Sequence, residues 1–348
     1  MTTPAIEAVF APPPPYEDGG AGAYNAAVLD AAGVRPAFFD SSCLLYRWLY
    51  AKAADYCKFA GSEDDRLVYR ACADVICDMA EACRVFRCAP VVAFDSRISY
   101  RREAVFAGYK SGRGTAKKTE AEERVLGLRH RMLAVLRDEL LPSYRVQTYC
   151  VRGYESDDVI ASFVLGLKHP KRYDGQVVIV SNDHDLHQLV TDGVRFADVM
   201  GGVLFDAAGL RKRYGFGPEQ VVPAKVFGGC SSDDVPNVPG CGEVSVRRLL
   251  ESRDPASVKQ SAARDSLVSA EGEAVMRRNM ALVRLPFDGA AFGCPPLPPL
   301  RLSRNMWPGE SVPEEIAALF GSFGIPQSAW PSFRDIRRAL PAEVEQMF

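Results

Sequence analysis

Short apolar runs that end at an acidic residue recur along the first two thirds of the chain. "PAFFD" ends at Asp40, "PVVAFD" ends at Asp95, and "QVVIVS" is followed by Asp183 and Asp185. Runs this rich in β-branched and aromatic residues predict short, buried strands. "RVQTYC" predicts a further strand, and "VRFAD" and "GVLFD" continue the same pattern.

Between these runs, apolar residues recur at three- and four-residue spacing, which predicts helices. The predicted helices cover residues 41–59, 65–89 and about 120–141, and another begins with "ESDDVIASFVLGL". The acidic start of that last helix suits the positive end of a helix dipole. Strands that alternate with helices predict right-handed βαβ units, and so an α/β fold with a mostly parallel sheet.

The two ends of the chain lack this alternation. Residues 1–35 contain "APPPP" and "EDGGAGA" and show no periodicity, so we expect a flexible N-terminal extension. Near the other end, "PPLPPL" is typical of a connector, and "PEEIAALFGSFG" predicts a helix that packs back on the core.

Composition narrows the class of protein. The 348 residues are 47% hydrophobic and 25% charged, as in ordinary globular proteins. No apolar run reaches about 18 residues, and the first residues show no signal-peptide pattern, so we expect an intracellular protein without a membrane span. The ten cysteines are then expected as reduced thiols, and they lack the CxxC spacing of a zinc site.

Acidic residues gather at the junctions that follow the predicted strands. A single aspartate there is usually a turn or helix-capping residue, but four consecutive acidic junctions favour a shared site. Carboxylates brought together in this way repel one another unless cations neutralise them, and hard oxygen ligands select Mg²⁺ or Mn²⁺. The residues in question are Asp40, Asp95, Glu155, Asp157, Asp158, Asp183 and Asp185.

Basic residues concentrate between residues 96 and 131. This segment holds ten Lys or Arg against four Glu, with Tyr100, Phe106 and Tyr109 between them. A basic block can be a solvated face. Cations beside aromatic rings are also the composition of a channel for single-stranded nucleic acid.

Five ordered motifs carry a resemblance to a known family. They are "FFDSSCLLYRW", "VVAFDSR…YRREAVFAGYKSGR", "GYESDDVIA", "VSNDHDLHQLV" and "FGGCSSDDVPNVPGCGEVSVRRLL". Over roughly residues 36–285 the chain resembles the flap endonuclease/5′-exonuclease family, which includes the 5′-nuclease domain of bacterial DNA polymerase I, phage flap endonucleases and phage ribonuclease H.

The resemblance implies a PIN-like parallel sheet flanked by helices, with a helical arch and a helix–three-turn–helix unit. The nuclease core would cover residues 36–215, with the arch in the basic segment 96–131. Residues 216–285 would form the DNA-binding region, and residues 286–348 a C-terminal segment packed on the core.

The resemblance also implies two ions of Mg²⁺ or Mn²⁺. The ligands of the first ion would be Asp40, Asp95, Glu155 and Asp157, with Asp158 beside them. The ligands of the second ion would be Asp183, Asp185 and Asp233.

Further residues match the positions by which the family holds its substrate. Lys110 and Arg113 would steer the scissile phosphate, and Tyr109 would stack on a base. The phosphate-binding arginine of the family corresponds to Arg101 or Arg102.

"VPNVPGCGEVSVRRLL" resembles the unit that holds duplex DNA in this family, often with a bound K⁺. Gly240 and Gly242 permit a tight turn, and backbone amides at the following helix start can bind a phosphate. An ordinary helix–turn–helix packing unit has the same pattern. Val244 stands where the family usually has lysine, so the binding of duplex DNA would depend on Arg247 and Arg248.

One departure from the family affects the second ion. The usual "GDSSDN" reads "GCSSDD" here, so Cys230 replaces an aspartate ligand while Asp233 is kept. A thiol is a poor ligand for Mg²⁺. The second ion would then bind weakly, or water or Asp234 would substitute.

The resemblance predicts a metal-dependent, structure-specific 5′-nuclease, acting as a monomer on DNA with a 5′ flap or 5′ end or on an RNA–DNA hybrid. A relative that binds branched DNA without efficient cleavage is the main alternative, favoured by Cys230. A PIN-type toxin ribonuclease is disfavoured by the long basic segment and by "VPGCG".

Overall fold

The structure is a computed structural model of the chain. It describes residues 3–11, 35–46, 49, 64–96, 100–112, 119–168, 173, 175–198, 203–287, 308–309 and 311–334.

A mostly parallel sheet forms the centre of one half of the molecule, the sheet half. Its described strands run in the order β3-β2-β1-β4-β5-β6. Adjacent strands from β3 to β5 are parallel, and β6 pairs with β5 in the antiparallel direction. This confirms the predicted fold class. The strands are β1 (Arg35–Asp40), β2 (Cys88–Phe94), β3 (Gln147–Cys150), β4 (Val177–Val180), β5 (Val194–Asp198) and β6 (Val203–Phe205).

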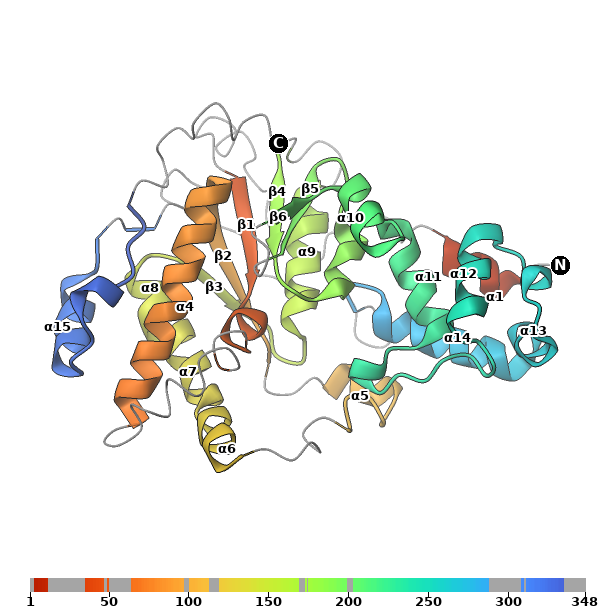
Figure 1. Cartoon of the computed structure of the whole chain (residues 1–348), viewed down its shortest axis with the longest axis horizontal. Helices are drawn as coiled ribbons and strands as arrows, with labels where there is room; N and C mark the ends of the chain where they lie inside the picture. Colours follow the sequence, from red (N-terminus) through yellow and green to blue (C-terminus); the bar gives the residue numbers. More distant parts are fainter. Residues whose placement is uncertain are drawn as a thin grey trace.

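The order of the strands reverses beside β1. Helix α4 (Asp64–Phe86) connects β1 to β2, and α9 (Ser156–Lys168) connects β3 to β4 on the opposite face of the sheet (Figure 1). Strand β1 therefore lies between β2 and β4, which the chain reaches by crossovers on different faces. In open α/β sheets such a switch point is where ligands bind, at the carboxyl ends of the strands.

The helices of this half lie close to where the sequence pattern predicts them, but one predicted helix is divided into shorter pieces. The predicted helix over 65–89 is α4, which ends early because β2 already begins at Cys88. Residues 41–46 are helical, as predicted, while most of 47–59 lies outside the described residues.

The predicted helix over 120–141 is divided. It consists of α6 (Glu120–Gly127), α7 (Arg129–Val135), a π-helical turn (Leu136–Leu140) and α8 (Leu141–Ser143). Gly127 is a weak helix former, and Pro142 cannot donate a backbone hydrogen bond, which accounts for both interruptions. The other helix of the basic segment is α5 (Tyr100–Val105). Residues 97–99 and 113–118 lie outside the described residues, so the helical arch stays a prediction.

A second, helical half lies beside the sheet (Figure 1). It has its own hydrophobic core, which includes Phe227, Leu249 and Met276. Its helices are α11 (Pro218–Gly228), α12 (Glu243–Ser252), α13 (Ser261–Val268) and α14 (Ala270–Val283), and α10 (Ala207–Tyr214) joins it to the sheet.

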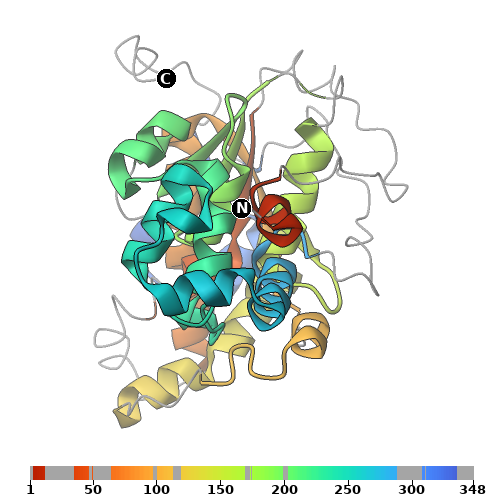
Figure 2. The ribbon, with the colours of Figure 1, turned by 90° about the vertical axis from the view of Figure 1, so that its right-hand side faces the viewer.

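Part of the expected N-terminal extension is structured. Residues Pro4–Phe10 form α1, which packs against α11 and α14 (Figure 2). Ile6 and Val9 are buried in the core of the helical half. The expectation of a flexible segment from residue 1 is therefore wrong for this helix, and residues 12–34 lie outside the described residues.

Helix α15 (Glu314–Ser322) lies at the end of the sheet half that is farthest from the helical half (Figure 1). Its residues Ile316 and Phe320 are buried in the core of the sheet, as the sequence predicted for this stretch. No helix in the described part of the chain is both long and apolar enough to cross a membrane.

Candidate metal centre

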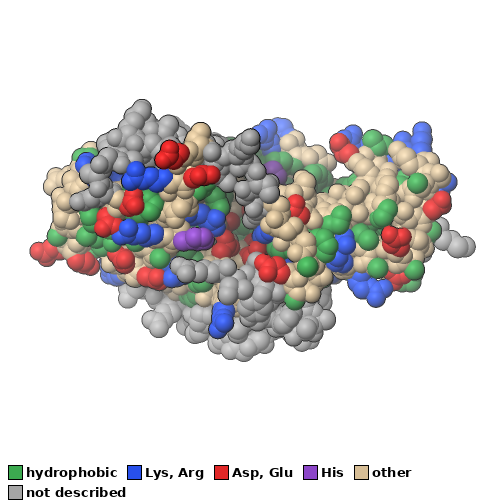
Figure 3. Space-filling view, turned by 90° about the horizontal axis from the view of Figure 1, so that it is seen from below, with side chains coloured by type: hydrophobic (Ala, Val, Ile, Leu, Met, Phe, Trp, Pro, Cys, Tyr) green, Lys and Arg blue, Asp and Glu red, His purple; other side chains and the backbone are tan. Residues whose placement is uncertain are grey.

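A cleft of about 440 Å³ opens at the carboxyl edge of the sheet. Seen from below, acidic side chains lie in the hollow at the centre of this face (Figure 3). They come from the ends of β1 and β2, the start of α9 and two loops, the elements that the sequence predicted to converge. The acidic residues that line the cleft are Asp40, Asp95, Glu155, Asp157, Asp183 and Asp233.

Asp40, the last residue of β1, is almost completely buried. Its Oδ1 accepts hydrogen bonds from the N–H of Ser42 (3.0 Å) and the hydroxyl of Ser156 (3.1 Å). Burial, followed by repulsion from Asp95 and Asp183, raises the pKa of Asp40 to about 7. A nearby cation would stabilise the charged form of this carboxyl group.

Asp95 follows β2 and is fixed by the same two serines. Its Oδ2 accepts a hydrogen bond from the hydroxyl of Ser42 (2.5 Å), and its Oδ1 accepts one from the N–H of Ser156 (2.8 Å). Ser42 and Ser156 therefore connect the ends of β1 and β2 to the start of α9. This sets Asp40 and Asp95 side by side.

Glu155, just before α9, is surrounded by cations. Its Oε1 accepts a hydrogen bond from Lys110 Nζ (2.5 Å), and its Oε2 accepts from Arg102 Nη1 (3.1 Å) and the Tyr109 hydroxyl (3.0 Å). Burial would raise the pKa of Glu155, but Arg102 and Lys110 outweigh it and lower the pKa. Glu155 is therefore held as a carboxylate.

Asp157 and Asp183 resist ionisation. Burial raises the pKa of Asp157 well above its ordinary value, although Arg102 opposes the shift. Burial also raises the pKa of Asp183, where Lys225 opposes the shift and Asp233 adds to it. Both carboxyl groups lie in a region with excess negative charge.

Asp185 occupies a different position from the one predicted. Its N–H donates to Asp183 Oδ1 (2.9 Å), and its carboxylate forms an ion pair with Lys225 of α11. It is not among the residues that line the cleft. Lys225 neutralises this carboxylate in the structure.

The loop with Cys230 and Asp233 closes one side of the cleft. The Cys230 thiol donates to Asp233 Oδ2 (3.3 Å). Asp234 Oδ2 accepts a hydrogen bond from the N–H of Gly112 (2.7 Å). Asp234 therefore holds the segment that follows Lys110, and does not replace the carboxylate that Cys230 lacks.

Lys110 is held by both its backbone and its side chain. Its N–H donates to the carbonyl of Asp233 (2.8 Å), and its backbone has a left-handed φ of 55°, which is uncommon outside glycine. Burial would lower the pKa of Lys110, but Glu155 and other acids of the cleft outweigh it and raise the pKa. The charged ammonium group is therefore fixed at the cleft.

The chemistry of the donors fits a divalent cation, although the side chains are paired with cations of the protein. Among the described residues, no group of three or more His, Cys, Asp or Glu side chains is arranged to hold a metal ion as it stands. Glu155 is bound to Lys110, and Asp185 to Lys225. Carboxylate oxygens suit Mg²⁺ and Mn²⁺ once the lysines release them.

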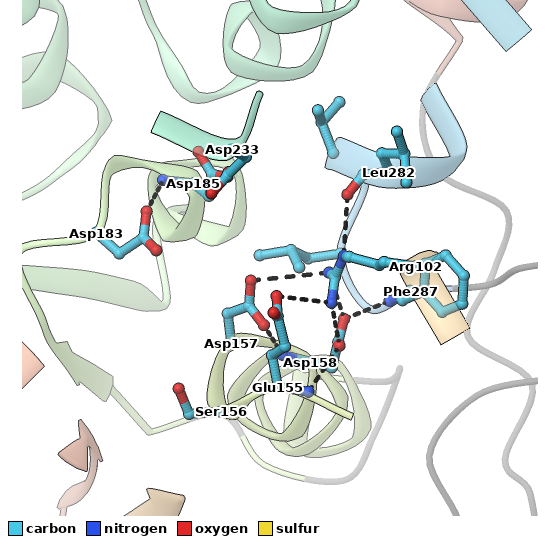
Figure 4. A network of polar contacts seen from close by, with 12 residues as sticks. Arg102, Glu155, Ser156, Asp157, Asp158, Asp183, Asp185, Asp233, Leu282 and Phe287 are labelled. Carbon is cyan, nitrogen blue, oxygen red and sulfur yellow. Dashed lines mark hydrogen bonds and ion pairs between the residues drawn. The ribbon is translucent and has the colours of Figure 1, made fainter. Parts of the chain in front are cut away.

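Three predicted roles differ from the observed positions. Asp158, a predicted metal ligand, is fully buried and bonded to Arg102. Arg102, a candidate for phosphate binding, is 2% exposed and turned toward these acids (Figure 4). Tyr109, predicted to stack on a base, is 6% exposed and donates to Glu155. Side-chain bonds from Arg102 and Tyr109 to Glu155 and Asp158 account for all three differences.

Two further residues of the predicted site have side chains outside the described part of the structure. Arg113 belongs to the segment that the structure does not describe. Arg101 lies in α5, but its side chain is also outside the description.

The predicted duplex-binding turn precedes α12. Gly240 has a left-handed φ of 76°, and Gly242 is the N-cap residue of α12. Arg247 is largely exposed and pairs with Glu243 (3.0 Å), whereas Arg248 is half-buried. The tight turn and the helix start are as the sequence predicted, and the binding of DNA there stays a prediction.

Among the side chains of the cleft that the sequence reasoning missed are three that carry a charge or an aromatic ring. Lys225 is a single cation in the apolar stretch "VVPAKVFGG", which could have marked it. Arg129 lies over the ring of Tyr46 (4.4 Å), and both line the cleft. Arg129 had been counted only as part of the basic block, and nothing in the sequence pattern marked Tyr46.

Known solved structures share this fold. Bacteriophage T5 flap endonuclease, described as a pseudo-enzyme-product complex with DNA and metal ions, is 19% identical with a TM-score of 0.56. The similarity covers 84% of this chain and 100% of that one. T5 5′-exonuclease with bound divalent zinc ions is 21% identical with a TM-score of 0.55, over 73% of this chain and 90% of that one.

Curated relatives are similar over about half of this chain. DNA polymerase I of Bacillus subtilis (strain 168) is 32% identical over 209 residues, which are 56% of this chain and 22% of that protein. Thermostable DNA polymerase I of Thermus aquaticus is 34% identical over 163 residues, 47% of this chain and 18% of that protein. The chain thus spans only about a fifth of the polymerases it matches.

The family model described as "5′-3′ exonuclease, N-terminal resolvase-like domain" matches residues 36–215. This match covers the whole parallel sheet and most of the acidic residues of the cleft. Because it spans more than half of the sequence, the chain belongs to the 5′-3′ exonuclease family through this resolvase-like domain.

Proposed function

We propose that the chain is a divalent-metal-dependent, structure-specific 5′-nuclease that hydrolyses phosphodiesters of 5′ flaps or RNA primers in DNA replication or repair. The observation that carries the proposal is the cleft where six acidic side chains from separate elements meet beside Lys110. Its substrate is DNA with a 5′ flap or 5′ end, or an RNA–DNA hybrid, and it acts as a monomer inside the cell.

The proposed cofactors are two ions of Mg²⁺ or Mn²⁺. Asp40, Asp95, Glu155 and Asp157 would hold one ion, and Asp183 and Asp233 the other, together with Asp185 once Lys225 releases it. The T5 structures described with metal ions support this assignment. Bound ions would stabilise the negative charge that develops on the phosphate during hydrolysis.

The protein's own groups would bind and orient the phosphate. Lys110 presents a fixed ammonium group beside Glu155 and Asp233, and it would shift from these acids to the phosphate oxygens. Arg113 would add a second cation. The serines that bond Asp40 and Asp95 keep these carboxylates in place while the charge in the cleft changes.

The helical half would hold the duplex. The turn at Gly240 and Gly242 exposes the start of α12, where backbone amides and the helix dipole favour a phosphate. Arg247 and Arg248 would add positive charge, and Arg101 would contact the strand near the cleft. We expect K⁺, if bound, at the backbone carbonyls of this turn.

The second candidate is a relative that binds branched DNA but cleaves it poorly. The observation that favours it is Cys230, whose thiol bonds to Asp233 where a further carboxylate would serve the second ion. Lys225 also favours this candidate, because it neutralises Asp185, a proposed ligand of the second ion.

A Mg²⁺ titration with a labelled 5′-flap duplex and a single-stranded RNA of matched sequence tests the proposal. We expect Mg²⁺-dependent cleavage of the flap, and expect Asp95→Asn to abolish cleavage while DNA binding is kept. Binding without cleavage at every Mg²⁺ concentration would favour the second candidate. Cleavage of the RNA alone would favour a ribonuclease of the toxin type.

A further inference from the structure

Arg102 is a buried arginine at the junction of the two halves. It lies on α5, is 2% exposed, and its guanidinium group points toward the first turn of α9 (Figure 4). An arginine that binds a DNA phosphate needs a face open to solvent or substrate. Arg102 has no such face, so its charge serves something inside the protein.

Each nitrogen of the Arg102 guanidinium group has a partner in the protein. Nε donates to the carbonyl of Leu282 at the end of α14 (3.1 Å). Nη1 donates to Asp158 (2.5 Å) and Glu155 (3.1 Å), and Nη2 donates to Asp158 (2.8 Å) and lies 3.7 Å from Asp157. Four of the five N–H groups of the side chain donate hydrogen bonds, and the fifth is on Nη2, which lies at ion-pair distance from Asp157. A phosphate could bind only by displacing one of these contacts.

Asp158 completes the network from the other side. It is fully buried, and its Oδ1 also accepts the N–H of Phe287 (2.6 Å) while its Oδ2 accepts the N–H of Glu155 (3.2 Å). Both oxygens are therefore occupied by donors that belong to the fold. Asp158 faces away from the cleft, which is lined by Glu155 and Asp157.

We propose that Arg102 and Asp158 form a positioning pair that aims Glu155 and Asp157 into the cleft, and that neither residue contacts DNA or metal. This inference rests on the proposed function, since the aimed carboxylates are the proposed ligands of the first ion. Asp158 fixes the guanidinium group in two-point contact, Nη1 also donates to Glu155, and Asp157 lies within ion-pair distance of Nη2.

The pair also explains how three acids fit within four residues. Without Arg102, the buried carboxylates of Glu155, Asp157 and Asp158 would repel one another at the start of one helix. The bond from Arg102 to Leu282 and the bond from Phe287 to Asp158 tie this cluster to the end of α14. The ligands of the cleft are thus anchored to the half proposed to hold the duplex.

The test is Arg102→Lys, which keeps the positive charge and removes the planar, two-point contact. Arg277→Lys is the matched control, because Arg277 is exposed on α14 and pairs only with Glu273 among the contacts described. We measure Mn²⁺ affinity by calorimetry without DNA, and flap-DNA affinity in EDTA over a range of salt concentrations. We expect Arg102→Lys to weaken Mn²⁺ binding by about 10–100-fold, as for residues that orient metal ligands.

Flap-DNA affinity in EDTA, and its dependence on salt, should stay as in the wild type. If Arg102 instead binds phosphate, Arg102→Lys leaves Mn²⁺ affinity unchanged and changes DNA affinity, and Arg102→Met lowers the salt slope by about one. Either result would overturn the inference. A wild-type protein that binds no Mn²⁺ would instead overturn the proposed function.

Asp158→Asn provides a second variant of nearly unchanged shape, in case Arg102→Lys does not fold. Within a positioning pair, the two substitutions should weaken Mn²⁺ binding by similar factors, and the double variant by little more than either alone. A loss of Mn²⁺ affinity in Asp158→Asn with wild-type affinity in Arg102→Lys would show that Asp158 is itself a ligand.

Discussion

At the scale of single residues, Lys110 has the clearest role to test. We expect Lys110→Ala to lower the single-turnover cleavage rate by about 10²–10³-fold, the effect of losing one fixed contact to a charged transition state. Duplex affinity should change little, because the helical half is proposed to carry it. Lys212→Ala is the matched control, since Lys212 is an exposed lysine on α10. Equal losses of rate and affinity would make Lys110 a binding residue only.

Asp40 links the cleft to the stability of the protein. Its pKa is about 7 in the folded state, against an ordinary value of 3.8. Between these values the folded state keeps a proton that the unfolded state has released, so the metal-free protein loses stability as the pH rises through this range. Asp40→Asn removes this loss, and should stabilise the metal-free protein near pH 8 by up to about 4 kcal/mol.

Urea denaturation in EDTA measures this effect. The difference in unfolding free energy between Asp40→Asn and wild type should be larger near pH 8 than near pH 5. The same difference at both pH values would contradict the assigned pKa.

Cys230 allows a gain of function to be tested. Because a thiol contributes little to Mg²⁺ binding, Cys230→Asp should lower the Mg²⁺ concentration for half-maximal cleavage. Cys230→Ala should have nearly wild-type activity. No change in metal dependence for Cys230→Asp, or a loss of activity in Cys230→Ala, would show that this loop does not serve the second ion.

Some residues of the cleft were predictable from sequence and others were not. Asp40 and Asp95 could be found because each ends a short, continuous apolar run that predicts a buried strand. The burial of Arg102 could not, because its partner Asp158 is 56 residues away and the pairing depends on how α5 packs. The motif made Arg101 or Arg102 a candidate for phosphate binding, since an exposed charge and a buried charge look the same in a sequence.

At the scale of elements, the turn before α12 can be tested with two glycines. A Cβ at Gly240 would lie 3.0 Å from the backbone of Ala263, and its φ of 76° disfavours other residues. Gly240→Ala should weaken duplex binding and destabilise the protein by about 1–2 kcal/mol. Gly242→Ala is the control, because a Cβ there meets nothing within 4 Å.

Filter binding to a flap duplex and thermal unfolding distinguish the two variants. Duplex affinity that falls equally in both would point to contact with the glycines themselves rather than to the shape of the turn. Unchanged affinity in Gly240→Ala would remove this turn from the proposed duplex site.

The ends of the helices depend on individual residues such as glycine and proline more than on the hydrophobic period. The amphipathic pattern over 120–141 is continuous, yet the structure divides it after Gly127 and at the π-helical turn Leu136–Leu140, which precedes Pro142. The hydrophobic period shows which face of a helix is buried. It does not show whether the backbone hydrogen bonds of the helix continue without a break. A closer reading of Gly127 and Pro142 would have found both interruptions.

At the scale of the whole molecule, the main surprise is α1. "PAIEAVF" is too short to show a clear helical period, and its burial depends on α11 and α14, more than 200 residues away. Phe10 lies 5.8 Å from Phe227, and Arg284 donates to the carbonyl of Ala11. The N-terminal helix is therefore part of the core of the helical half.

This packing predicts that the first helix supports DNA binding from a distance. Ile6→Ala should destabilise the protein by about 2–5 kcal/mol, the cost of truncating a buried side chain. Ala8→Ser, on the exposed side of the same helix, is the control. Because Ile6 lies in the core of the half that also carries Asp233 and anchors the start of α9, flap-DNA affinity and Mn²⁺ affinity should both fall at a lower temperature than in wild type, and Ala8→Ser should change neither. Calorimetry during heating measures both affinities, and a loss of DNA affinity with unchanged Mn²⁺ affinity would show that the two halves unfold independently.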